Sequence, residues 1–133
     1  MKRHGILNAQ LAGCIAGLGH KDLFMVADAG MPIPKGVPLI DLAVCGGVPT
    51  FRQVMDAILE EAVVEHYIVA EEIDSHNPET LSYIRQKLPD VPCDKVPHLQ
   101  LKELSEKVKF AVRTGEFSPY PNIICRAGVA FPV

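Results

Sequence analysis

The chain has 133 residues, a length that suits one domain with its own buried core and no need for disulfides. Its net charge is −3 and its Lys and Arg residues are scattered singly, which argues against a nucleic-acid partner, because proteins that follow phosphates present a basic stripe. No apolar run approaches the roughly 20 residues that cross a bilayer, and residues 1–10 turn polar too early for a signal-peptide core, so we expect no membrane segment.

The first part of the chain predicts a helix and two strands. Apolar residues recur at helical spacing after Asn8, which can cap the helix, and Gly19 suits the position just past its end. The apolar run 23–27 is typical of a buried strand, and it stops at Asp28. A loop rich in Pro and Gly follows, and a second strand is expected over 39–44.

The middle of the chain carries two clear helix starts. Thr50 with Gln53 three residues later forms a capping box, which predicts a helix to about residue 63. Asn77 followed by Pro78 provides a cap and a first-turn proline for a helix to about residue 88. Between these helices, residues 66–70 have the composition of a strand.

The rest of the chain alternates in the same way. We expect an extended stretch at 94–96, a helix over about 101–108, and strands at 110–113 and 123–131. Helices that alternate with short apolar strands favour an α/β layered fold, here as a single domain over residues 1–133.

Cysteine usage and apolar content indicate the cellular compartment and the oligomeric state of the protein. The four cysteines are widely spaced among apolar neighbours and form no CxxC pair, which indicates reduced cysteines in a cytoplasmic protein. Hydrophobic residues make up 48% of the chain, more than a small domain hides internally, so we expect a homo-oligomer.

Standard cofactor signatures are missing from the sequence. The GxG at residues 17–19 closes a helix and follows no strand, so it lacks the context of a dinucleotide-binding loop. There is no P-loop, no GxSxG elbow and no His pair with the helical spacing of zinc ligands. We therefore expect no cofactor and no metal, and a chemistry that side chains perform unaided.

Several polar residues occupy positions where α/β proteins bind ligands. Asp28 ends a buried strand, His20 lies just beyond a helix whose terminal carbonyls favour its protonated form, and His98 follows a short extended segment. Tyr120 and Asn122 stand in a proline-framed loop that could hold their OH and amide groups in place. Each also has a purely structural interpretation: a helix cap for His20, a helix entry for His98, and turn residues for the other three.

The remaining histidines, His4, His66 and His76, are assigned to the surface or to local structure. Glu71 and Glu72 cannot both face one side of a strand, so at most one of them can join a site.

Blocks along the chain resemble the ribose branch of the ribose/fucose mutarotase family. The similarity runs from residue 2 to about 131 and is weakest between about 79 and 108. Its specificity comes from blocks that occur in order and at matching spacing. These are LGH at 18–20, DAGMPIP at 28–34 and RTGEFSPYPN at 113–122.

The resemblance implies a Rossmann-like mixed sheet flanked by helices. It also implies an isomerase that interconverts the pyranose and furanose forms of free ribose, supplying ribose catabolism, and a decamer of two pentameric rings with sites near subunit contacts. By the same resemblance His20 is the proton donor. The expected sugar-binding residues are Asp28, His98, Tyr120, Pro121 and Asn122.

The chain departs from the family pattern in two places. Leu99 and Gln100 follow His98 where acidic residues are common, and Pro121 stands where a small residue is expected, which removes one backbone N–H donor. Two other functions remain open: a fucose-type mutarotase that exchanges α and β anomers, and a non-catalytic sugar-binding protein of a transport system.

The chemistry of ring exchange suits these side chains. Opening a cyclic hemiacetal needs a proton delivered to the ring oxygen and one removed from the anomeric hydroxyl, and reclosure through a different hydroxyl changes the ring size. Positioned acid and base groups give about 10²–10⁴-fold acceleration. Our hypothesis is that His20 protonates the ring oxygen, that the other residues orient hydroxyls, and that one of them or a water accepts the anomeric proton.

Overall fold

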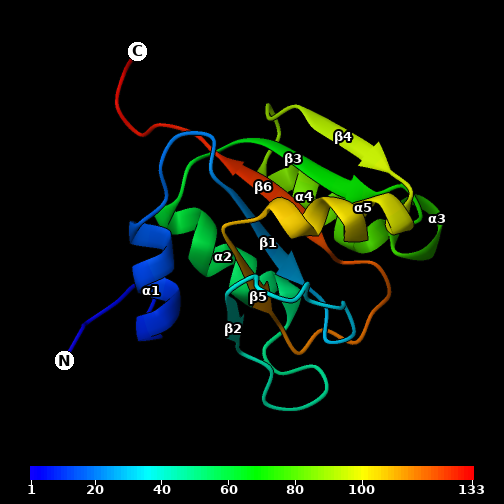
Figure 1. The fold of residues 1–133 in the computed structure, drawn as a ribbon, viewed down its shortest axis with the longest axis horizontal. Helices are drawn as coiled ribbons and strands as arrows, with labels where there is room; N and C mark the ends of the chain where they lie inside the picture. Colours follow the sequence, from blue (N-terminus) through cyan, green and yellow to red (C-terminus); the bar gives the residue numbers. More distant parts are fainter.

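The computed structural model describes residues 1–133 as one layered α/β unit. Its strands form one six-stranded sheet in the order β2-β5-β1-β6-β3-β4. The strands are β1 (Leu23–Ala27), β2 (Leu39–Asp41), β3 (Val64–Ala70), β4 (Cys93–Val96), β5 (Phe110–Arg113) and β6 (Ile123–Ala127). All pairings are parallel except those of β6, which runs antiparallel to both of its neighbours, β1 and β3 (Figure 1).

Three of the predicted helix starts are confirmed. The side chain of Asn8 caps the first helix, Thr50 and Gln53 form both halves of a capping box, and Asn77 caps a helix that opens on proline. The helices are α1 (Ala9–Ala16), α2 (Phe51–Glu61), α3 (Ile73–His76), α4 (Pro78–Lys87) and α5 (His98–Leu104), followed by the 3₁₀ turn η1 (Ser105–Lys107).

Helices cover the two faces of the sheet unequally. On one face, α1, α2 and α4 enclose the larger core, in which the rings of Phe24 and Phe110 stack with their centroids 5.5 Å apart. On the other face, α5 packs through Leu101 over a smaller core (Figure 1). That face stays partly open where β3 begins and β6 ends, and Glu65 and Arg126 are half-exposed there.

The mixed sheet flanked by helices is the predicted class, but several element boundaries were predicted wrongly. β2 stops at Asp41, where the side-chain carboxylate accepts the backbone N–H of Ala43 and so turns the chain. The same carboxylate pairs with Arg113. β6 ends at Ala127, well before residue 131. α1 ends at Ala16, before the expected end near Gly19.

Helix α5 begins at His98, three residues before the predicted start. The carbonyl of Pro97 accepts the N–H groups of Gln100 and Leu101, so the proline supplies the first helical acceptor although it has no N–H of its own. The short helix α3 was not predicted.

The direction of β6 decides which residues can meet. The carboxyl ends of β1, β3, β4 and β5 and the start of β6 all lie at one edge of the sheet, because only β6 is reversed. Asp28, Tyr120 and Asn122 therefore converge at this edge. The residues before β1, including His20, lie at the opposite edge, beside the segment that follows β6.

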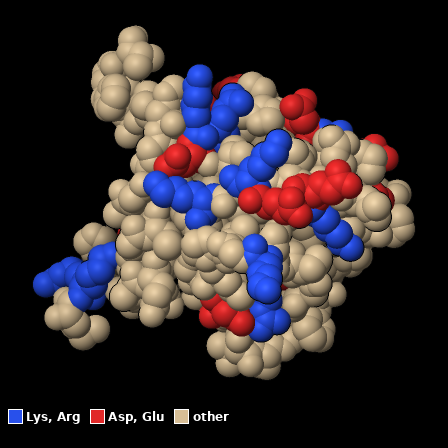
Figure 2. All heavy atoms as spheres, viewed as in Figure 1, with Lys and Arg blue, Asp and Glu red and all other residues tan.

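Charge is distributed without a dominant sign. Figure 2 shows basic and acidic side chains interspersed over the face that carries α5, with no broad area of either. None of the helices combines the length and the apolar character that a membrane crossing requires.

Candidate functional site

Asp28 and Asn122 form a reciprocal pair where β1 ends and β6 begins. The backbone N–H of Asp28 donates to Oδ1 of Asn122 at 2.8 Å, and Nδ2 of Asn122 donates to Oδ2 of Asp28 at 3.1 Å. The other carboxylate oxygen of Asp28 accepts the N–H of Gly30 at 2.9 Å. Asn122 is only 1% exposed, so the pair fixes the Asp28 carboxylate against a buried anchor.

The loop before β6 is tied down from two directions. Nδ2 of Asn77 donates to the carbonyl of Pro119 at 2.9 Å and to the hydroxyl of Ser118 at 3.0 Å, while its side-chain oxygen caps α4. Glu116 accepts the N–H groups of Ser118 and Phe51. Burial acts to raise the pKa of Glu116, but these hydrogen bonds outweigh it and lower the pKa.

Tyr120 is held in an uncommon conformation by this loop. Its φ is 65°, in the left-handed region that non-glycine residues seldom adopt. Its ring lies between two histidine rings, with the centroid of His98 at 5.1 Å and that of His76 at 5.2 Å, both edge-on. Pro121, which follows, is buried.

His98 is placed by the start of α5. Its backbone N–H donates to both carboxylate oxygens of Glu72, at 3.0 and 3.1 Å. Glu71 and Glu72 lie in the turn after β3, so the strand geometry assumed for them in the sequence analysis was wrong. Burial and then the nearby charge of Lys102 lower the pKa of His98. Its Nδ1 is buried without a hydrogen-bond partner, which also disfavours the protonated ring. His98 is thus arranged as a neutral imidazole.

A cavity of about 280 Å³ lies among these groups, and Asp28, His98 and Tyr120 line it together. Lys102, which the sequence analysis did not single out, also lines it. The signal for Lys102 was available, because it lies four residues after His98 and so shares one face of α5. No group of three or more His, Cys, Asp or Glu side chains is placed to hold a metal ion.

His20 lies at the other edge of the sheet. It precedes β1, whereas Asp28 follows it, and a five-residue strand spans about 16 Å. His20 lines a separate hollow of about 420 Å³ together with Phe131 and other mostly apolar residues. A single pentose in the cavity beside Asp28 therefore cannot reach the His20 of the same chain.

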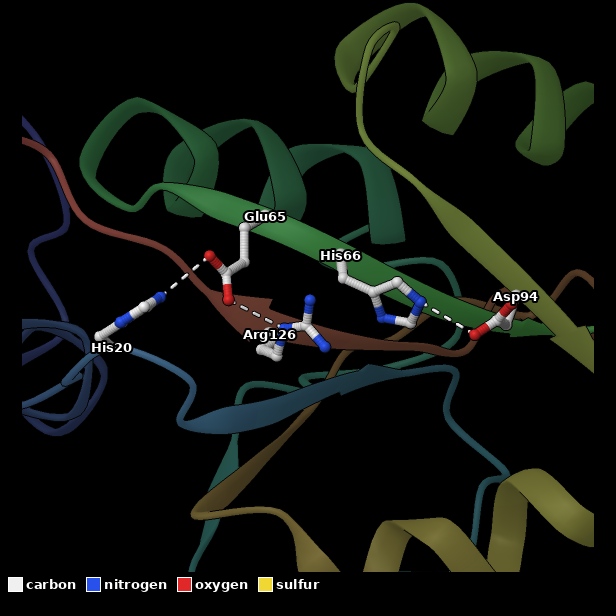
Figure 3. Close-up of polar contacts among 5 residues, drawn as sticks. All are labelled: His20, Glu65, His66, Asp94 and Arg126. Carbon is white, nitrogen blue, oxygen red and sulfur yellow. Dashed lines mark hydrogen bonds and ion pairs between the residues drawn. The ribbon is translucent and has the colours of Figure 1, made fainter. Parts of the chain in front are cut away.

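The ring of His20 contacts a carboxylate instead of the end of α1. Its Nε2 lies 3.1 Å from Oε2 of Glu65, and Oε1 of Glu65 accepts Nε of Arg126 at 2.9 Å (Figure 3). The carbonyl of Gly17 at the end of α1 accepts from Lys109. The helix-cap interpretation of His20 is therefore wrong, and so is the expectation that helix carbonyls are its partner.

Comparison with known proteins decides the relationship. A family model described as the RbsD / FucU transport protein family matches residues 1–130. The chain belongs to this family. The resemblance drawn from the LGH, DAG and RTGE blocks is thereby confirmed.

Two relatives in the RbsD / FucU family match almost from end to end. A Streptococcus uberis protein named D-ribose pyranase is 50% identical over 130 residues, which cover 97% of this chain and 98% of that protein. The structure of Bacillus subtilis RbsD complexed with D-ribose superposes with a TM-score of 0.94 at 42% identity, covering 98% of this chain and all of that one.

A more distant structure shares the fold. The fucose mutarotase of Streptococcus pneumoniae in complex with L-fucose has a TM-score of 0.80 at 24% identity, over 94% of this chain and 95% of that one.

Proposed function

We propose that this chain is an isomerase that exchanges the pyranose and furanose forms of free D-ribose. The observation that carries the proposal is the nearly complete structural match to a protein that holds D-ribose. The chain's own polar cavity, with a fixed carboxylate and a neutral imidazole, suits a molecule rich in hydroxyl groups. A fucose-type activity has weaker support, because that similarity is one of fold.

Ring opening requires one group that donates a proton and another that accepts one. We propose that His20 delivers a proton to the ring oxygen and that neutral His98 accepts the proton of the anomeric hydroxyl, which gives the open-chain aldehyde. The carboxylate of Asp28 accepts hydrogen bonds from hydroxyls and selects which of them can reclose the ring. Tyr120 shapes the wall, Pro121 is buried next to it in the chain without lining the cavity, and Asn122 acts mainly by holding Asp28.

The separation of His20 from Asp28 leads us to propose that a complete site forms between two copies of the chain. Exposed apolar side chains flank both half-sites: Phe117, 78% exposed, borders Asp28, and Phe131, 68% exposed, borders His20. An interface that joins one edge of the sheet in one copy to the opposite edge in the next would cover both phenylalanine side chains. Such an interface is head to tail, and head-to-tail interfaces close into rings when the rotation permits.

The finer assembly predicted from the family, a decamer of two pentameric rings, fits this head-to-tail arrangement and stays a proposal. Sedimentation at micromolar concentration tests it, since a species near 14.5 kDa would contradict any assembly. The cytoplasmic location expected from the cysteines also stays a prediction.

The activity is tested by NMR saturation transfer on free D-ribose with catalytic amounts of protein and no added metal or nucleotide. We expect faster transfer between the anomeric signals of pyranose and furanose forms. Acceleration of L-fucose anomer exchange alone would assign the fucose-type reaction instead. Activity that is lost after EDTA treatment and restored by a divalent ion would contradict the expectation of a cofactor-free enzyme.

A further inference from the structure

Two histidine–carboxylate pairs lie side by side on the open face of the sheet. In one, Nε2 of His20 meets Oε2 of Glu65 at 3.1 Å, and in the other, Nε2 of His66 meets Oδ2 of Asp94 at 3.0 Å (Figure 3). The pairs differ in their surroundings. Asp94 is 72% exposed and has no further cation, whereas Glu65 is 30% exposed and its second oxygen is taken by Arg126.

Backbone geometry sets the position of Glu65. The pairing of β3 with β6 shifts register between Val64 and His66, so Glu65 lies at an irregularity in the ladder. The chain passes close to it after β6, because a Cβ added to Gly128 would lie 3.2 Å from Cβ of Glu65. With Arg126 on one oxygen and His20 on the other, the carboxylate has one arrangement that satisfies both contacts.

We propose that Glu65, held by Arg126, is the positioning residue for His20. This inference rests on the proposed function, because it concerns the proton that His20 delivers. Glu65 binds Nε2 of the ring, which leaves Nδ1 as the nitrogen that faces the sugar and gives up the proton. The fixed negative charge also stabilises the imidazolium that the reaction consumes and restores.

The ionisable groups around the pair support this assignment. The hydrogen bond from His20 is the largest influence that lowers the pKa of Glu65, and Arg126 adds to it, so the carboxylate is charged at neutral pH. Asp22 is occupied by the N–H of Gly19 and by Lys109. Glu61 lines the same hollow as His20, and Lys21 is exposed beside it. Glu65 is the carboxylate in contact with the ring.

The test compares Glu65→Gln with Asp94→Asn. Glutamine keeps an oxygen for the ring nitrogen and removes only the charge, and Asp94→Asn removes a charge of the same sign from the neighbouring pair. For Glu65→Gln we expect kcat for ribose ring exchange to fall by about 10-fold with KM nearly unchanged, because the loss acts on the reacting proton and not on sugar contacts. The alkaline limb of the pH profile should move to lower pH. Asp94→Asn should match the unmodified chain in both measurements.

A second measurement needs no sugar. The side-chain NMR signals of the His20 ring nitrogens should change in Glu65→Gln, because the ring loses its charged partner, and should stay in place in Asp94→Asn. If the unmodified chain shows no ring exchange, the proposed function fails, while these signals still test the contact. Unchanged kcat and unchanged His20 signals in Glu65→Gln, or equal changes in both variants, would overturn the role of Glu65.

Discussion

The two edges of the sheet hold their candidate side chains in different ways. At the edge where β1 ends, Asp28 is hydrogen-bonded to a buried asparagine and to its own turn, and the facing loop is anchored by Asn77 and Glu116. At the edge where β1 begins, the His20 side chain is 47% exposed and makes a single hydrogen bond, to Glu65.

This difference matches the tasks that we assign to the two edges. Recognition of hydroxyls benefits from acceptors that are fixed before the sugar arrives, because ordering them on binding would reduce affinity. A proton donor that works on a sugar held by another copy must protrude from its own subunit. The rigid edge is therefore suited to binding, and the exposed edge to donation across an interface.

The largest effect is expected at the exposed edge. His20→Gln should reduce ribose ring exchange by about 10²–10⁴-fold, because glutamine can hydrogen-bond a sugar oxygen but cannot supply a proton. Ribose affinity, measured by calorimetry, should stay within about tenfold, since it depends on several hydroxyl contacts at the other edge. Near-normal exchange in this variant would show that His20 is not the proton donor, and that role would move to His98.

Mixed assemblies test whether one site takes its His20 and its Asp28 from two different copies of the chain. His20→Gln and Asp28→Asn chains, each nearly inactive alone, would be co-expressed with different tags and purified together. If each site takes His20 from one copy and Asp28 from the next, random mixing leaves about a quarter of the sites intact and should restore about a quarter of the activity. No recovery in a verified mixed assembly would mean that one chain supplies the whole site.

A smaller effect is expected from the anchor of the rigid edge. Asn122→Ala leaves the part-buried N–H of Asp28 without its acceptor, which should lower the free energy of unfolding by about 1 kcal/mol. The freed carboxylate should also bind ribose more weakly. Chemical denaturation and calorimetry measure the two effects. An unchanged affinity would show that the orientation of Asp28 does not depend on Asn122.

The smallest effect is a pH dependence of stability. Burial, followed by the charge of Lys102, lowers the pKa of His98 from its ordinary value of 6.5, so near that pH the unfolded chain binds more protons than the folded one. The free energy of unfolding should therefore decrease as pH falls from about 7.5 to about 5.5. Denaturant midpoints across this range measure the slope.

A control variant tests whether His98 causes this pH dependence of the unfolding free energy. His98→Gln removes the titrating ring, so its denaturant midpoint should vary less with pH over the same interval. The carboxyl groups whose pKa values are lowered have ordinary values of 3.8 and 4.5, so their contributions are lost at lower pH. An equal slope in His98→Gln would contradict the assignment.

Local sequence signals predicted the elements well where the stabilising contacts are themselves local. Thr50 and Asn77 cap helices through contacts only three residues away, and the strand 23–27 is a continuous apolar run. Asp41, where β2 ends, pairs with Arg113, which is 72 residues away along the chain. No local pattern contains that contact.

The sequence likewise predicted only part of the candidate site. The sequence placed Asp28, His98 and Tyr120 at the ends of elements, and the structure brings them around one cavity. It did not reveal the separation of His20, because nearness along the chain to Asp28 conceals that a strand lies between them. Glu65 was also missed, since its role depends on the pairing of β3 with β6.

The placement of His20 and Asp28 at opposite edges has a consequence for anyone who measures this activity. If the functional unit is a pair of edges from two copies, specific activity is not a constant of the chain but depends on its concentration. Dilution below the dissociation constant of the assembly would separate His20 of one copy from the sugar-binding residues of the next, and activity would be lost. Ribose, which would contact both copies, would oppose that dissociation by mass action. The substrate would then stabilise the oligomer that catalyses its own conversion.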